Sequence, residues 1–175
     1  DVMADWVVGR PLPLLSRAHV EAAAAAVAAP LGRSERGETL YALQARLRQV
    51  MWEHVGLIRA GEGLKLALTE IEEIAARLEH VAVRGGGAYN LAWQDWLNLQ
   101  SQATAAWLIA RSALERTESR GSHYRRDFPA TAAEPLTVLS DFADGAAPKV
   151  WTEPVRYTRV KPDAARRPMT VDVGD

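Results

Sequence analysis

The chain has 175 residues, of which 48% are hydrophobic and 25% charged, the ordinary composition of a globular domain. Its 21 Lys and Arg residues against 22 Asp and Glu residues give a formal net charge of −1, which disfavours nucleic-acid binding. The absence of cysteine excludes disulfides, thiol catalysis and thiolate metal sites, and no apolar run approaches the roughly 20 residues of a membrane span.

The positions of proline divide the chain into three parts. Proline occurs at positions 11, 13 and 30 and then not again before position 129. Because proline costs about 3 kcal/mol inside a helix, the interval without proline is where long helices can form. We therefore expect an N-terminal linker (1–37), a helical domain (38–129) and an extended or irregular C-terminal tail (130–175).

The N-terminal linker contains an alanine-rich segment, 16–29, that predicts a short helix. Ser16 is the candidate N-cap, and Pro30 with Gly32 would end the helix. Alanine side chains bury little area, so we interpret this segment as a connector helix that lies on a larger structure.

Three longer segments follow, each with apolar residues at spacings of three and four, which predicts amphipathic helices. They cover residues 39–55, 62–83 and 90–117. Each helix has one apolar stripe that must be buried on the other two, and the joints between them are short. The predicted fold class is therefore all-α, an antiparallel three-helix bundle with a short alanine-rich N-terminal helix and an extended C-terminal tail.

Glycine and asparagine mark the expected ends of these helices. Gly56 is placed for a left-handed C-cap of the first, glycines 85–87 for the end of the second, and Asn90 for the N-cap of the third. Trp107 lies in the middle of the third apolar stripe, so we expect it in the core. Its replacement by alanine would then cost about 3–5 kcal/mol.

The periodicity ends after residue 128. Residues 129–149 show no clear period, whereas 150–160 are rich in β-branched and aromatic side chains, which indicates an extended segment. Pro154 restricts that segment to an edge strand at most. Residues from 164 onward are expected to be disordered.

One group of polar residues invites comparison with a hydrolase. Ser119, His123 and Asp127 recur every four residues, but Gly121 would break any helix that aligned them. Catalytic triads are defined by geometry, and their members usually come from distant parts of a chain. We therefore interpret this group as a polar turn.

Two further patterns are interpreted as structural. Gly61 and Gly63 resemble the start of a dinucleotide fingerprint, but Leu66 occupies the place of the third glycine and a helix precedes the motif. The four histidines, at positions 19, 54, 80 and 123, lack the spacing of a metal site. The sequence therefore predicts neither a nucleotide site nor a metal site.

The densest polar cluster covers residues 115–129, and its plainest interpretation is a solvated helix end. In an up-down-up bundle, however, the first and third long helices end at the same pole. Residues 56–59 and 118–121 should then be neighbours. We expect Arg59 to pair with Glu118 and to hold the loop after the third helix.

Two motifs resemble the C-terminal helical domain of succinate dehydrogenase/fumarate reductase flavoprotein subunits, which L-aspartate oxidase shares. The first is Met-x-x-x-Val-Gly-x-x-Arg at 51–59, and the second is Glu-Ser-Arg-Gly-x-His-Tyr-Arg-x-Asp-Phe-Pro at 118–129. The resemblance covers about residues 38–129. Residues 151–159 look like the closing segment of the succinate/fumarate type, which favours that type over L-aspartate oxidase.

The resemblance implies a spectrin-repeat type of bundle that follows an FAD-binding domain with an inserted capping domain. In this family the flavin and the substrate-binding residues belong to those other domains. FAD is therefore expected in the parent protein, and this segment is expected to have no catalytic, cofactor-binding or metal-binding residue. The resemblance implies a contact surface toward the FAD-binding domain that contains Arg59, Glu118, Ser119, Arg120, Gly121, His123 and Arg125.

The implied partners are the FAD-binding domain of the same polypeptide and an iron–sulfur subunit of an electron-transport enzyme. The implied location is cytoplasmic, with peripheral attachment at the inner face of the membrane through partner subunits.

The alternatives are the C-terminal domain of L-aspartate oxidase and a free-standing helical interaction module. A reading frame that continues upstream into a flavin-binding domain would exclude the free-standing module. An isolated fragment would expose an apolar patch and could self-associate.

Overall fold

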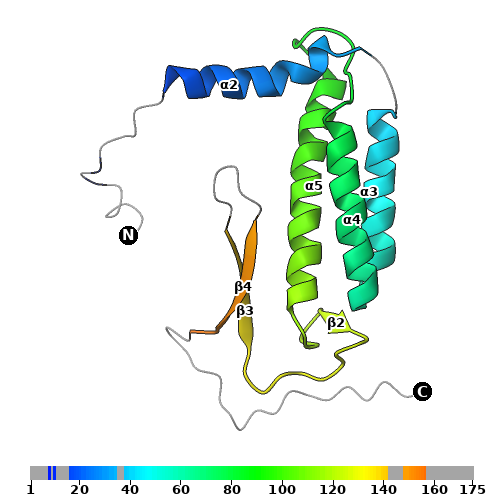
Figure 1. The fold of residues 1–175 in the computed structure, drawn as a ribbon, viewed down its shortest axis with the longest axis vertical. Helices are drawn as coiled ribbons and strands as arrows, with labels where there is room; N and C mark the ends of the chain where they lie inside the picture. The colour runs from blue at the N-terminus through cyan, green and yellow to red at the C-terminus, as the bar shows by residue number, and fades with distance from the viewer. Residues whose placement is uncertain (1–7, 9, 11–15, 35–37, 142–147, 157–175) are drawn as a thin grey trace.

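The computed structural model describes residues 8, 10, 16–34, 38–141 and 148–156. This part of the chain is mostly helical and has two small two-stranded sheets (Figure 1). No helix within these ranges is long and apolar enough to cross a membrane. The helices are α2 (Arg17–Ala28), the 3-10 turn η1 (Ala29–Gly32), α3 (Leu40–Val55), α4 (Gly61–Leu78) and α5 (Leu91–Glu115).

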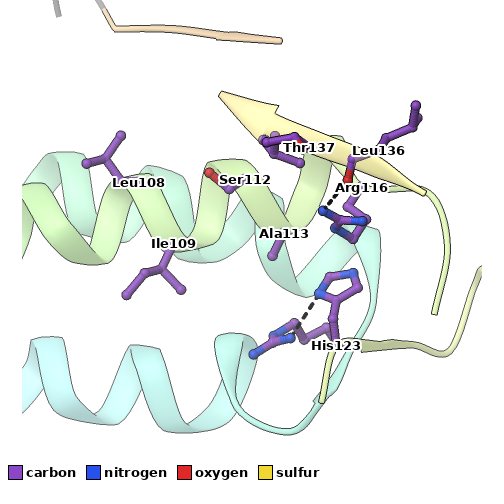
Figure 2. A pocket seen from close by; sticks show the side chains of 10 residues that line it. Leu108, Ile109, Ser112, Ala113, Arg116, His123, Leu136 and Thr137 are labelled. Atoms are coloured by element: carbon purple, nitrogen blue, oxygen red, sulfur yellow. Dashed lines mark hydrogen bonds between the residues drawn. The ribbon is translucent and has the colours of Figure 1, made fainter. Parts of the chain in front are cut away.

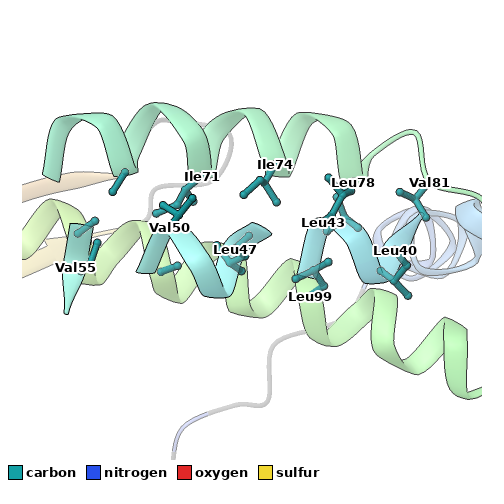
Figure 3. Close-up of a cluster of buried hydrophobic side chains, with 14 of the residues drawn as sticks. Leu40, Leu43, Leu47, Val50, Val55, Ile71, Ile74, Leu78, Val81 and Leu99 are labelled. Carbon is teal, nitrogen blue, oxygen red and sulfur yellow. The ribbon is translucent and has the colours of Figure 1, made fainter. Parts of the chain in front are cut away.

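Helices α3, α4 and α5 lie side by side and share one apolar core (Figures 1 and 3). Leu43 of α3, Ile71 of α4 and Leu99 of α5 are each 1% exposed or less. Burying a leucine or isoleucine side chain fully contributes about 1.5–3 kcal/mol, so this shared stripe is the main source of stability. The expected amphipathic pattern of the three segments is confirmed.

The N-terminal ends of two helices are capped by side chains. Thr39 Oγ1 accepts a hydrogen bond from the amide of Ala42 at 3.3 Å. Asn90 Oδ1 accepts one from the amide of Trp93 at 3.1 Å, as the sequence predicts. Each cap satisfies an amide that the first helical turn would leave without a partner.

Helix α4 ends at Leu78, well before the glycines that were expected to end it. Beyond that point the chain turns, and both Val81 and Val83 pack into the core. The amide of Val83 donates to the carbonyl of Pro30 at 2.9 Å, a contact that a continuing helix could not make. The apolar residues that extended the predicted stripe are therefore core residues in a non-helical conformation.

The expectations for Gly56 and Trp107 are wrong, whereas Ser16 is the N-cap residue of α2 as expected, although its side chain makes no capping bond. Gly56 has φ −63°, so it is not a left-handed cap; a Cβ there would lie 2.8 Å from the carbonyl oxygen of Trp52. Trp107 is half-buried and packs at the edge of the core, whereas Trp96 is 2% exposed and lies within it.

Helix α2 extends away from the three long helices (Figure 1), and none of its residues is buried. It therefore does not lie along the three long helices, and its expected contact with a larger structure stays a prediction. Its C-terminal end is anchored to α5, because Trp93 Nε1 donates to the carbonyl of Val27 at 2.8 Å and Pro30 is buried.

The described part of the tail forms an antiparallel hairpin of β3 (Leu136–Asp141) and β4 (Lys149–Pro154) beside α5. The register runs from the pair Leu136–Pro154 to the pair Asp141–Lys149. The extended segment expected from position 150 is confirmed as far as Pro154, which ends the strand. β3 was not predicted, and the residues from 164 onward lie outside the described ranges.

Candidate functional site

One pole of the helices joins segments that are far apart in sequence. β1 (Ile58–Arg59), between α3 and α4, pairs in parallel with β2 (Tyr124–Arg125), after α5. The amide of Arg126 also donates to the carbonyl of Arg59 at 2.8 Å. The segment 56–59 and the loop after the third helix thus lie at one pole, but the residues that contact 58–59 are 123–126 and not the expected 118–121.

The buried side chain of Arg125 closes the C-terminal end of α5. The residue is 2% exposed although it carries a full charge. The last carbonyls of a helix lack intrahelical donors and carry partial negative charge, so a guanidinium there satisfies both needs. Arg125 Nη1 donates to the carbonyls of Ala113 at 2.8 Å, Leu114 at 3.0 Å and Arg116 at 3.1 Å.

The carboxylate of Asp127 connects this arginine to the next helix. Its two oxygens accept hydrogen bonds from Nε and Nη2 of Arg125 at 2.8 and 2.7 Å. Oδ2 also accepts from the amide of Gly61, the first residue of α4, at 3.0 Å. The hydrogen bonds from Arg125 in particular lower the pKa of Asp127 well below its ordinary value, against the opposing effect of burial. Arg125 and Asp127 thus tie the negative end of α5 to the positive end of α4.

The same carboxylate decides whether the glycines at the start of α4 could hold a flavin dinucleotide. A pyrophosphate binds where free amides point out of a helix N-terminus. Here the amide of Gly61 already donates to Asp127, and the preceding β1 is only two residues long. The start of α4 therefore does not fit the pyrophosphate of FAD, and no reaction step is assigned to it.

Glu118 is buried at 5% exposure at the same pole, but it does not pair with Arg59 as expected. It accepts hydrogen bonds from Arg116 Nη1 at 2.7 Å, Arg120 Nε at 3.1 Å and the amide of Ala132 at 3.0 Å. Burial alone would raise the pKa of Glu118, but these hydrogen bonds outweigh it and the pKa is lowered. The two arginines that satisfy this carboxylate lie two positions away on either side, and the third donor, the amide of Ala132, comes from farther along the same loop.

A tight turn follows Glu118. The amide of Arg120 donates to the carbonyl of His123 at 2.8 Å, and the amide of His123 donates back at 3.0 Å. Gly121 occupies the turn with φ +59°, a conformation that side chains with a Cβ rarely adopt. Ser119 Oγ accepts from the amide of Arg125 at 2.9 Å and donates to the carbonyl of Phe128 at 2.8 Å. The turn is thus held by its own backbone and by Ser119.

Arg59 contacts His123 in place of Glu118 (Figure 2). Its Nε donates to the carbonyl of Val55 at 3.0 Å, and its Nη1 lies 3.0 Å from His123 Nδ1. Because a guanidinium only donates, Nδ1 must accept, which places the ring proton of neutral His123 on Nε2. Burial, and then the charges of Arg59 and Arg116, lower the pKa of His123. Burial also lowers the pKa of Arg59.

The proton-bearing Nε2 of His123 is buried and has no hydrogen-bond partner of good geometry within the described part of the chain. The nearby carbonyl of Arg116 raises the pKa of His123 slightly against the stronger effects of burial and charge, but that oxygen already accepts from Arg125. An open pocket of about 540 Å³ lies beside these residues, between the end of α5 and β3. Arg59, Arg116 and His123 line its polar side, and Ile109 and Val138 are among its apolar lining residues.

The arrangement contains no nucleophile activated by a base. Ser119 bonds to backbone groups, His123 to Arg59, and Asp127 to Arg125. The interpretation of the first group of polar residues as a turn is therefore confirmed. In the described ranges no three His, Cys, Asp or Glu side chains are grouped so that they could hold a metal ion.

The structure adds two residues to the site that sequence reasoning missed. Arg116 bridges Glu118 and the carbonyl of Leu136, and Asp127 bridges Arg125 and Gly61. Both are charged residues within the polar cluster at 115–129, and their place in that cluster is the sequence feature that could have indicated them. Their roles depend on which backbone groups lie opposite them, and the sequence does not contain that information.

Comparison with known proteins places the whole of this pole within one family match. Residues 44–168 match the family model described as the C-terminal domain of fumarate reductase flavoprotein. The chain is 43% identical over 95 residues to an uncharacterized FAD-dependent oxidoreductase of Methanocaldococcus jannaschii, covering 54% of this chain and 17% of that protein. It is 45% identical over 86 residues to L-aspartate oxidase of Rhodospirillum rubrum, covering 49% of this chain and 25% of that protein.

A solved structure extends the similarity over nearly the full chain. The Mycobacterium smegmatis Sdh1 complex in the apo form contains a chain that matches with a TM-score of 0.77 and 31% identity. The match covers 90% of this chain and 27% of that chain. The present chain spans a quarter or less of the two curated relatives.

Proposed function

The chain belongs to the family of fumarate reductase flavoprotein C-terminal domains, and we propose that it braces the FAD-binding domain of a succinate dehydrogenase/fumarate reductase-type flavoprotein. The observation that carries this proposal is that the two motifs of the resemblance, 51–59 and 118–129, meet at one pole through β1 and β2. Side chains there lock helix ends together. Such a pole can hold a shape against a neighbour.

We infer that α3, α4 and α5 form an antiparallel three-helix bundle of the spectrin-repeat type, the middle part (38–129) of the three-part chain. The shared core supports this, as does the meeting of three helix ends at one pole. The linker (1–37) and the tail (130–175) would then be attachments to this domain. The hairpin beside α5 is the described part of that tail.

The residues proposed for the interdomain contact divide into two roles. Arg59, Arg120, Gly121 and His123 present atoms at the surface of the pole. Beneath them, Glu118, Ser119 and Arg125 are nearly inaccessible and fix the backbone that carries the surface residues. In the parent protein FAD would supply the redox chemistry on a dicarboxylate, and this chain would supply no reacting group.

We favour the succinate/fumarate type over L-aspartate oxidase as the parent. The family match continues through the hairpin to residue 168, and the Sdh1 match covers 90% of the chain. An iron–sulfur subunit as electron-transfer partner, with peripheral attachment of the assembly at the inner face of the membrane, is part of the same proposal.

The experiment compares the full-length flavoprotein with a version that lacks this chain. We expect the shortened protein to release FAD at a lower temperature, measured as the rise in free flavin fluorescence. The purified 175-residue chain should be colourless and should not take up added FAD. Equal flavin retention with and without the chain, or stoichiometric flavin bound to the chain alone, would overturn the proposal.

A further inference from the structure

The three seams between the long helices differ in how they are closed. The α3/α4 seam carries exposed ion pairs that cross it, Arg46 with Glu70 and Arg77 with Glu38 at 2.9 Å. At the α4/α5 seam Trp107 Nε1 donates to Glu72 Oε1 at 2.9 Å. At the α3/α5 seam Tyr41 Oη donates to Asp95 Oδ2 at 3.3 Å near the N-terminal ends of both helices, and these two helices contact each other less than either contacts α4.

The α3/α5 seam is an open, mostly apolar groove of about 440 Å³. Trp52 on its α3 side is 82% exposed, and Ile109 on its α5 side is 50% exposed. Ala105 and Ala106 also line it, and their small side chains leave space between the helices. We define this surface as the α3/α5 groove. Its exposure of a tryptophan and an isoleucine side by side is unusual for a surface that faces water.

The groove is continuous with the pole described above, because Ile109 lines both the groove and the pocket beside Arg59 and His123. Neither lining contains an aspartate or a glutamate, while Arg48 lies at the groove and Arg59 and Arg116 at the pocket. Arg59 forms no ion pair with any residue of the described chain, although burial already removes part of its hydration. The combined surface is therefore apolar along its length and cationic at its rim and end.

This combination selects the chemistry of the partner. A stable interface has an apolar centre and matches charge at its edges. A surface of this kind fits a neighbour with apolar side chains opposite Trp52 and Ile109 and with carboxylates opposite Arg48 and Arg59. The α3/α4 seam, in contrast, already pairs charges of its own across it.

We propose that the α3/α5 groove and the Arg59–His123 pole form one docking surface for the FAD-binding part of the same polypeptide, with acidic side chains of that part opposite Arg48 and Arg59. The proposal rests on the proposed function. It adds which face of this chain the FAD-binding part covers and which charge that part carries there. The matches cover 25% of the R. rubrum relative and 27% of the Sdh1 chain, so most of each of those proteins lies outside the part matched by this chain. A surface of the same polypeptide is held at high effective concentration and does not need a large interface to dock.

The first test uses the absence of cysteine from this chain. Gln102→Cys places a thiol in the groove, and Leu66→Cys places one on the exposed outer side of α4 as a matched control. In the full-length FAD-loaded protein, maleimide labelling followed by peptide mass spectrometry should modify the groove thiol about tenfold more slowly than the control, since interface cores exclude solvent. Equal labelling rates would overturn the proposal.

The other occupants give distinct results. Protection of Gln102→Cys that disappears on dilution would assign the groove to a second copy of the chain. Protection that appears only when an iron–sulfur subunit is bound would assign it to that subunit. Either result would overturn this proposal while leaving the proposed function intact, because that function is tested by deleting the whole chain.

The second test examines charge. Arg48→Glu in the full-length protein should lower the temperature of flavin release by several degrees, because it places a carboxylate opposite the proposed acidic surface. Lys65→Glu, on the exposed side of α4, makes the same charge change away from the groove and should leave that temperature unchanged. Neither side chain forms an ion pair with another described residue, so the substitutions break no ion pair in that part of the chain. Equal effects of the two substitutions would contradict the proposed charge match.

Discussion

At the scale of single residues, the pole is organised by the needs of helix ends. Arg125 meets the free carbonyls of α5, and Asp127 meets the first amide of α4. Both are charged, and each lies at the helix terminus of opposite sign. The charge pair therefore joins two helices end to end, which neither residue could do alone.

The first prediction concerns Arg125. Arg125→Ala removes the donor to three helix carbonyls and leaves Asp127 without its partner, so we expect the free energy of unfolding to fall by about 3 kcal/mol or more. The neighbouring Arg126 has an exposed side chain, and Arg126→Ala should change stability by less than about 0.5 kcal/mol. Urea unfolding of the two variants measures both values. Similar losses from the two substitutions would show that Arg125 does not cap α5.

The second prediction concerns pH and His123. Its pKa in the folded chain lies below the ordinary 6.5, so the unfolded chain takes up this proton first as the pH falls. Stability from His123 is therefore full above about pH 6.5 and declines as the pH falls through that value toward the lower folded pKa. His123→Asn keeps an acceptor for Arg59 but does not titrate. The free energy of unfolding, measured in steps of about half a pH unit from pH 7.5 to 5, should decline less in this variant than in the parent.

The acidic residues act in a lower pH range, which separates their effect from that of His123. The pKa values of both Asp127 and Glu118 are lowered in the folded chain. Their contribution is therefore present above their unfolded pKa values, near 4, and is lost as the pH falls below that range. An unchanged slope between pH 7.5 and 5 in His123→Asn would mean that another group titrates there.

At the scale of elements, the helices are defined by their apolar stripes but ended by tertiary contacts. α4 ends at Leu78, whose carbonyl accepts from Trp96 Nε1 at 3.0 Å. The guanidinium of Arg33 lies 5.5 Å from the Trp96 ring centroid. Trp96 thus joins α5 to the end of α4 and to the segment after η1.

The third prediction compares two tryptophans of α5. Trp96→Ala should cost about 3–5 kcal/mol, because it leaves a cavity in the core. Trp107 is half-buried, so Trp107→Ala should cost less, contrary to the full core penalty expected from the sequence. Thermal melting of both variants with the parent gives the order. A larger loss of stability for Trp107→Ala than for Trp96→Ala would contradict the burial of Trp96 in preference to Trp107.

At the scale of the whole molecule, the α3/α5 groove is an apolar surface that the described residues leave exposed. The groove combines Trp52 with Ile109, which are 82% and 50% exposed. This is the surface from which an isolated chain would be expected to self-associate.

The fourth prediction follows from that surface. In sedimentation velocity the 175-residue chain should shift to larger species as its concentration rises. Trp52→Ser should reduce this association, whereas Leu66→Ser, which removes an exposed apolar side chain from α4, should not. A strict monomer at every concentration would show that the exposed groove is too small to hold a second copy.

The sequence by itself determined the helical segments, the cap at Asn90, the pole at which 56–59 and the loop after α5 both lie, and the family. These follow from local periodicity, local capping chemistry and motifs whose residues are adjacent in the chain. The structure alone decided that Arg59 contacts His123, that Glu118 is satisfied by Arg116 and Arg120, and that Trp96 is buried in preference to Trp107. Periodicity defines the direction of a stripe but not its width, and ion pairs depend on separations of a few ångströms that only the packed backbone determines.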